Sequence, residues 1–182
     1  MADDAPPPPA AGSPFSGLGA GIAAAARLTE GAPLRRLPDW EARLSRWINQ
    51  AQNRRWDPGR WDCCMSWCDA VREMTGVDPG ARVRGRYTTM EGAAATVIRL
   101  YYDAGIRSFE AAVAAEMVHH GLVGWDRPAQ ARRGDVVCFD QPPPHGVTWG
   151  IVDLTGERFA AAGRDGLMWG AVAKCRRAWA VG

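Results

Sequence analysis

The sequence predicts an α+β protein in which the helices come first and an antiparallel β-sheet follows. Up to about residue 121, apolar side chains recur at the spacing of amphipathic helices. After Arg133 the pattern changes to short β-rich runs separated by Gly, Pro and Asp turns. Helices followed by strands, rather than alternating with them, are typical of α+β domains.

Four helices are expected, each bounded by a proline, a capping side chain or a glycine. Their expected ranges are 38–53, 62–74, 89–105 and 108–121. In the second helix Asp62 stands in the N-cap position, and Gly76 follows the end. One face of this helix carries side chains that should be buried together: Cys63, Trp67, Ala70, Val71 and Met74.

Five strands are expected in the second half of the chain. Their approximate ranges are 135–139, 147–153, 158–162, 167–169 and 177–181. Because the turns between them are short, we expect an antiparallel meander with the N-terminal helices packed on it.

Two segments of different composition divide the chain. Residues 1–36 are rich in Pro, Gly and Ala without a sustained apolar period, which predicts a flexible arm that orders only on binding a partner. Residues 37–182 form the expected single domain. A chain of 182 residues with 47% hydrophobic side chains buries one core and has no room for a second full domain.

Charge and cysteine content exclude several classes of protein. A net charge of +2 is too small for a typical nucleic-acid-binding protein. The modest apolar run over 17–28 has no basic segment before it and is too short for a membrane span. Five cysteines, an odd number, are unlike a secreted disulfide framework and favour synthesis in a reducing cytoplasm. No cofactor is expected.

Cys63 is the first candidate functional residue. It falls in the first turn of the second expected helix, where unpaired N–H groups and the helix dipole stabilise a thiolate. The adjacent negative charge of Asp62 opposes this effect, so a nucleophile and a core thiol both stay open. Together with Cys64 and Cys68 the spacing is wrong for a zinc knuckle, and no metal site is expected.

Three segments, WDPGRWDC (56–63), RRGDVVCF (132–139) and TWGIVDLTGERF (148–159), follow one another along the chain. In this order they resemble the cysteine-bearing segment, the Gly-Asp strand and the histidine strand of NlpC-type peptidases of the papain-like superfamily, which are cysteine hydrolases of the cell wall. Residues 37–181 are also similar to an uncharacterised family of tailed phages and prophages, through the segments LPDWEARL, TGVDP, RGRYTT, DGL and CRRAWAV.

The resemblance implies a papain-like (NlpC-type) fold with Cys63 in the nucleophile position. It also implies a place in the phage tail, contacts with other tail or baseplate proteins, and peptidoglycan peptide stems as ligand. Trp56 and Trp61 flank a Pro-Gly loop just before Cys63 and are expected to line the substrate cleft. Arg60, between them, is expected to pair with a stem-peptide carboxylate.

Two departures from the peptidase pattern concern the general base. The histidine position corresponds to Thr148, which leaves a substrate-binding role for that residue, and the third polar position falls near Ala160 or Ala161. His145, three residues upstream of Thr148, is the candidate replacement base. The pair His119 and His120 is expected to be a solvated helix C-terminus instead.

The sequence therefore leaves two functions open. In the first, a tail-tip or tail-associated virion protein engages peptidoglycan stems during genome delivery and cuts them through Cys63 and His145. In the second, the same fold is a purely structural tail-assembly module without catalysis, and its arm binds a neighbouring tail protein.

Overall fold

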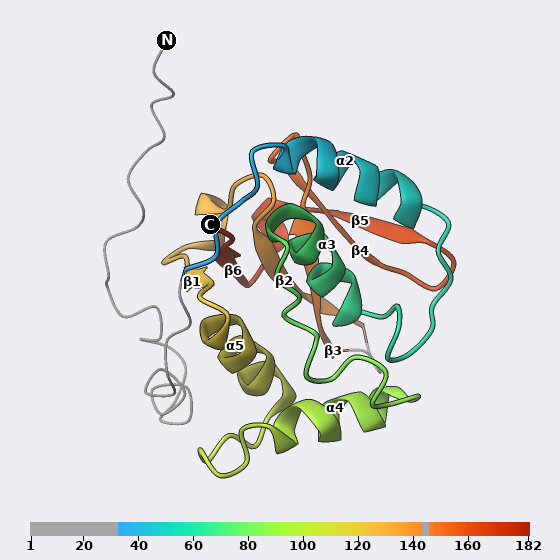
Figure 1. Ribbon diagram of the computed structural model, residues 1–182, viewed down its shortest axis with the longest axis vertical. Coiled ribbons are helices and arrows are strands. Elements are labelled where there is room, and N and C mark those ends of the chain that lie inside the picture. Colours follow the sequence, from blue (N-terminus) through green and yellow to red (C-terminus); the bar gives the residue numbers. More distant parts are fainter. Residues whose placement is uncertain (1–32, 143–145) are drawn as a thin grey trace.

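Short helices occupy the first part of the chain, as expected. The computed structural model describes residues 33–142 and 146–182 and is drawn in Figure 1. Its helices are α2 (Trp40–Ala51), α3 (Met65–Thr75), α4 (Met90–Arg99) and α5 (Phe109–His119), with 3₁₀ turns η1 (Pro128–Gln130) and η2 (Val172–Lys174). Within the described residues, no helix is both long enough and apolar enough to cross a membrane.

Capping residues fix where these helices begin and end. The side chains of Thr89 and Ser108 accept hydrogen bonds from N–H groups one turn ahead, at 3.1 Å and 3.3 Å, so α4 and α5 begin as expected. Gly76 adopts a left-handed conformation (φ 80°) directly after α3. α4 ends at Arg99, earlier than expected, and turns carry the chain on to Gly105.

The second half of the chain forms one antiparallel sheet of six strands. These are β1 (Val123–Gly124), β2 (Val136–Gln141), β3 (Gly146–Val152), β4 (Arg158–Ala162), β5 (Leu167–Ala171) and β6 (Arg177–Ala180). Their order in the sheet is β1-β6-β2-β3-β4-β5. The expected meander is therefore correct for β2 to β5, but β6 returns to pair with the free edge of β2, and the short β1 had not been expected.

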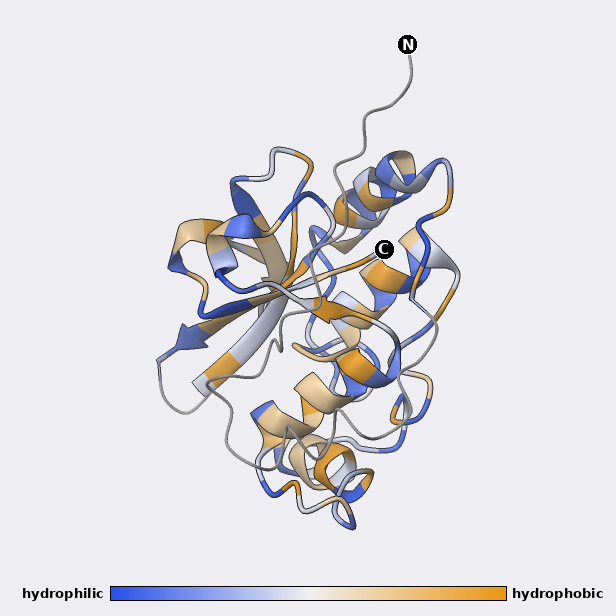
Figure 2. Cartoon of the chain, turned by 90° about the vertical axis from the view of Figure 1, so that its left-hand side faces the viewer, coloured by the Kyte–Doolittle hydropathy of each residue, from blue (hydrophilic) through white to orange (hydrophobic). Residues whose placement is uncertain are grey.

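The sheet has a core on each of its two faces, and Figure 2 shows the layers in profile. On one face α2, α3 and α5 cover a large core. The sheet contributes to it the buried side chains Val136, Cys138, Trp149, Ile151, Ala160, Ala162 and Trp179. On the other face, Val137, Phe139, Val152, Phe159 and Ala161 form a smaller core, against which Trp125, Ala131 and Cys175 pack. We call these the helix face and the loop face of the sheet.

Asp135 joins the two ends of the described chain. This carboxylate is fully buried and accepts hydrogen bonds from Arg36 at 2.9 Å, from the Trp125 indole at 2.8 Å and from the Val181 N–H at 3.2 Å. Arg36 also donates to the Val181 carbonyl, and Leu34 is buried nearby. Contacts of the domain thus include residues that we had placed in the arm, which was expected to extend to residue 36.

The α+β class and the packing of N-terminal helices on an antiparallel sheet are therefore confirmed. The sheet belongs to the C-terminal half, and α3 contacts β3 and β4 directly. This arrangement brings the segment that carries Cys63 against the helix face of the sheet.

Candidate functional site

The candidate site lies at the head of α3, where a tight loop leads into the two neighbouring cysteines. The loop is closed by two backbone hydrogen bonds between Asp57 and Trp61, of 2.8 Å and 2.6 Å. Cys63 and Cys64 follow in a turn, and the helix begins at Met65. Cys63 therefore precedes the first turn of the helix instead of lying within it.

Asp62 organises this turn. Its carboxylate is fully buried and accepts four hydrogen bonds of 2.7–3.0 Å, whose donors are the N–H groups of Gly59, Cys64 and Met65 and the hydroxyl of Tyr87. Free N–H groups at a helix start are what an oxyanion would bind. Here the side chain of Asp62 already occupies two of them, so those two groups are not free for a substrate. The expected N-cap position itself was wrong: α3 begins at Met65, its N-cap is Cys64, and Asp62 binds the start of the helix from two residues further upstream.

The thiols beside Asp62 are buried. Cys63 is 5% exposed and Cys64 is 3% exposed. A hydrogen bond with Cys63, followed by burial and the charge of Asp62, raises the pKa of Cys64 well above its ordinary value. Burial likewise raises the pKa of Cys68. Cys64 and Cys68 are therefore neutral thiols near neutral pH.

One cluster of metal-type ligands occurs in the described part of the chain. The Asp62 carboxylate and the sulfurs of Cys63 and Cys64 lie within 4.8 Å of one another. Both oxygens of Asp62 already accept two hydrogen bonds each, so an ion would have to displace buried donors. The donor set is accordingly better suited to organising the turn than to holding a metal.

Trp61 does not line a cleft, contrary to expectation. It is 1% exposed, its ring lies 5.9 Å from that of Trp47, and the Arg54 guanidinium covers it at 4.3 Å from the ring centroid. Loop composition suggested exposure, but packing between α2 and α3 buries this indole. Trp61 is a core residue whose N–H has no hydrogen-bond partner among the described residues.

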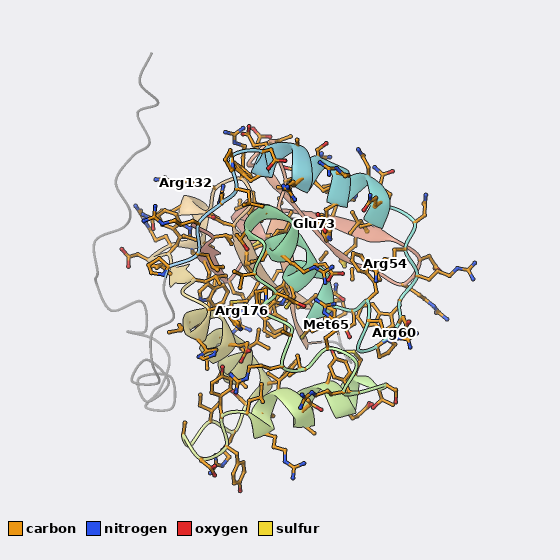
Figure 3. The ribbon with its side chains drawn as sticks, viewed as in Figure 1. Arg54, Arg60, Met65, Glu73, Arg132 and Arg176 are labelled. Carbon is orange, nitrogen blue, oxygen red and sulfur yellow. The ribbon has the colours of Figure 1, made fainter. Side chains whose placement is uncertain are left out.

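Trp56 and Arg60 remain accessible on the same loop. Trp56 is half-buried, and its backbone N–H donates to the Arg164 carbonyl at 3.0 Å. The Arg60 side chain is 79% exposed, and its nearest acidic partner, Asp57, is 3.9 Å away. Figure 3 shows Arg60 and Arg54 on the side of the molecule where α3 begins. Arg60 is thus free to bind an anion.

The register of β3 decides which of its side chains face α3. Trp149 lies directly opposite Cys138, which belongs to the helix face, whereas Thr148 lies opposite Phe139, which belongs to the loop face. Directly paired residues share a face of the sheet. Thr148 is therefore buried on the side away from α3, which contradicts its expected place near Cys63. The indole of Trp149, packed edge-on against Phe109 at 5.4 Å, faces the helices instead.

The third polar position of the expected catalytic set is filled by an alanine on either face of β4. Ala160 is on the helix face and Ala161 on the loop face, and neither carries a polar group. His145 lies outside the described residues. Within them, the side chains of β3 in the helix-face core are Val147, Trp149 and Ile151, none of which can move a proton.

Glu116 is a buried, ionisable residue that the sequence did not lead us to expect. It lies in α5 and is 4% exposed. Its carboxylate accepts hydrogen bonds from the Tyr101 hydroxyl and, at 3.3 Å, from Arg82, and a ring nitrogen of His120 lies within hydrogen-bond distance, also at 3.3 Å. Burial favours its neutral form, but His120, Tyr101 and Arg82 outweigh burial and hold the pKa of Glu116 below its ordinary value. An acidic residue in the apolar run EAAVAAEMV was the available signal. His120 is accordingly half-buried in this network and is not simply solvated.

Comparisons with known proteins give one finding. Residues 35–181 match a family described as a domain of unknown function, DUF6950. No curated protein matches the chain, and no solved structure does. The matched range contains Arg36, the head of α3 and the whole sheet. The chain therefore belongs to the DUF6950 family.

Proposed function

We propose that this chain is a tail-associated phage protein whose domain is a papain-like, NlpC-type module that has lost catalysis. In this role the domain binds peptide stems of peptidoglycan during genome delivery without cutting them. The observation that carries the proposal is the surroundings of Cys63. The cysteine stands at the head of a helix packed on an antiparallel sheet, but no proton-transferring side chain faces it from the described part of β3.

Two details support a loss of turnover. An acyl-transfer cycle needs a base beside the thiol and donors for the oxyanion. The helix-face position on β3 is occupied by Trp149, and two N–H groups at the head of α3 are bonded to Asp62. The neighbouring Cys64 is a neutral thiol because its pKa is raised, so it cannot serve as the nucleophile in place of Cys63.

Binding of a peptide stem is supported by the loop before Cys63. Arg60 is exposed with only a distant acidic partner, and Trp56, four residues earlier in the same loop, is partly exposed. A guanidinium binds a carboxylate through two parallel hydrogen bonds, and an adjacent ring adds apolar contact. Stem peptides carry free carboxylates, so this loop fits them better than it fits a neutral ligand.

The test uses purified peptidoglycan and the full chain. We expect co-sedimentation of the wild-type protein without the release of new amine ends. Arg60→Ala should weaken co-sedimentation, whereas Arg99→Ala, an exposed arginine on α4, should leave it unchanged and serves as the matched control. Cys63→Ala should bind as the wild type does.

Each other result has a defined meaning. Amine release that disappears in Cys63→Ala would show an active hydrolase, and His145→Ala would then test the base. If the wild-type protein does not co-sediment with peptidoglycan, the proposed binding of stem peptides is wrong, and the alternative function as a structural assembly module is favoured. Mass spectrometry of purified virions tests tail membership, and absence of the protein from them would contradict it.

A further inference from the structure

A surface depression of about 270 Å³ lies beside α2, and its lining includes no residue of the loop before Cys63. One wall is α2, the second is the β3–β4 turn, and the third is the edge strand β5; Figure 1 shows α2 lying across β4 and β5. This volume is near the lower end of the range for small-molecule sites, about 300 Å³. It is enough for a ligand of one or two rings.

The aromatic side of the depression is Trp169 on β5. Its side chain is 40% exposed, which is unusual in a chain whose other tryptophans are buried or half-buried. The Arg158 guanidinium lies 4.9 Å from its ring centroid, and Asp153 holds that guanidinium through two hydrogen bonds of 3.1 Å and 3.2 Å. The indole is thereby fixed in orientation while part of it stays open to solvent.

The polar side of the depression is one face of α2. Ser45, Asn49 and Gln52 are spaced by four and three residues, so they line up along the helix. Their side chains line the depression, where one hydroxyl and two amides offer both donors and acceptors. They are available to a ligand.

A backbone hydrogen bond joins two walls of the depression. The N–H of Leu167 donates to the Gln52 carbonyl at 3.2 Å, joining the end of α2 to the start of β5. Gly166 permits this approach, because a Cβ at that position would lie 2.0 Å from the same carbonyl oxygen. The depression therefore exists before a ligand arrives.

Charge decides the class of ligand. The charged side chains that line the depression are Asp153 and Arg158, and they neutralise each other. A charged ligand would gain little there, whereas a ligand with hydroxyl and amide groups around a flat apolar ring face matches both walls. We propose that this depression binds a neutral saccharide, with one pyranose ring on Trp169 and its hydroxyl groups bonded to the polar face of α2.

This inference does not rest on the proposed function. It uses α2, β5 and the β3–β4 turn, and it does not involve Cys63 or Arg60. Saccharide binding can therefore fail while stem-peptide binding holds, and the reverse also applies.

The experiment is isothermal titration of the full chain with two soluble trisaccharides, one built of N-acetylglucosamine and one of glucose. We expect binding of at least one of them. Trp169→Ala should weaken it at least about tenfold, because the stacking surface is lost, and Trp169→Phe should restore part of the affinity. Asn49→Ala, an exposed helix position that should not affect folding, should weaken binding by about threefold to tenfold.

Tyr102→Ala is the matched control. Tyr102 is also an exposed aromatic residue (54%) covered by an arginine, since Arg107 lies 3.7 Å from its ring centroid, but it lies in the turns after α4 and does not line this depression. The control should bind as the wild type does. The proposal is overturned if neither trisaccharide binds, if Trp169→Ala and Asn49→Ala keep wild-type affinity, or if Tyr102→Ala weakens binding equally.

Discussion

The hydroxyl of Tyr87 donates a buried hydrogen bond of 2.8 Å to the carboxylate of Asp62. Burial, with the nearby Cys64 and Asp62, raises the pKa of Tyr87 far above its ordinary value, so the phenol is a hydrogen-bond donor near neutral pH. This bond ties the loop before α4 to the head of α3. The conformation of the cysteine turn thus depends on a residue 25 positions further along the chain.

Removing this hydroxyl should destabilise the fold. Tyr87→Phe leaves one oxygen of Asp62 with a single buried donor, and hydrogen bonds to charged groups contribute about 1.5–3 kcal/mol. We expect the free energy of unfolding in urea to fall by about that amount. Tyr102→Phe, which removes an exposed hydroxyl, should leave it unchanged. Equal urea midpoints for the two variants would contradict the role of Tyr87.

Two glycines with almost the same backbone conformation should respond differently to alanine. Gly59 and Gly76 have φ of 81° and 80°. A Cβ at Gly59 would lie 2.2 Å from the Tyr87 carbonyl oxygen, whereas a Cβ at Gly76 would have no other atom within 4 Å. Gly76→Ala should cost about 1–2 kcal/mol from the left-handed conformation alone. Gly59→Ala should cost a further 1–3 kcal/mol or so from the clash. Urea unfolding of both variants measures the difference, and equal losses would show that the loop relaxes.

Local signals explain why so much of the fold could be predicted from the sequence. Thr89 and Ser108 cap helices at the positions expected, because a capping side chain and the helix it starts are a few residues apart. Strands β2 to β5 follow from short β-rich runs between turn residues. The return of β6 to β2 is a pairing over a long sequence distance, and no local pattern specifies it.

The candidate site was harder to predict because both faces of the sheet are buried. A strand that alternates apolar and polar residues reveals its inner face, but VTWGIV is nearly all buried, so no alternation in it indicates that Thr148 faces away from α3. Trp61 was misplaced for a related reason. Its loop looks exposed, but the contacts with Trp47 and Arg54 that bury it come from another element.

Thiol labelling should report the state of the cysteines. Cys175 is the most accessible of the five, whereas Cys63, Cys64, Cys68 and Cys138 are buried. We therefore expect an alkylating reagent to modify Cys175 first in the native protein at neutral pH, as followed by mass spectrometry of peptides. Faster labelling of Cys63 than of Cys175 would indicate an exposed thiolate. It would count against the loss of catalysis.

The start of the domain can be tested with two truncations. Removing residues 1–32 should leave the free energy of unfolding unchanged, because the expected arm lacks an apolar pattern to pack. Removing residues 1–36 also deletes Arg36, the ion-pair partner of the buried Asp135. Breaking a buried pair by removing one partner costs about 3–5 kcal/mol, so this truncation should unfold at much lower urea concentration. Equal stability of the two truncations would place the domain boundary after Arg36.

The charge of Glu116 should make part of the stability depend on pH. Its pKa in the folded protein is lower than the ordinary value of 4.5, because hydrogen bonds from His120 and Tyr101 and the charge of Arg82 outweigh burial. As the pH falls below about 4.5, the unfolded chain takes up this proton before the folded protein does. The contribution of Glu116 is therefore fully present above that value and is lost as the pH falls through the lower folded pKa.

Glu116→Gln isolates this contribution. The variant should be less stable than the wild type by about 2 kcal/mol at neutral pH, since amide groups bond more weakly to Arg82 and Tyr101 than a carboxylate does. Because only the wild type loses stabilisation from this group in acid, the difference between the two unfolding free energies should shrink as the pH falls below about 4.5. Urea titrations at several pH values measure this difference. A difference that stays constant down to the lowest pH would mean that the charge of Glu116 does not stabilise the fold.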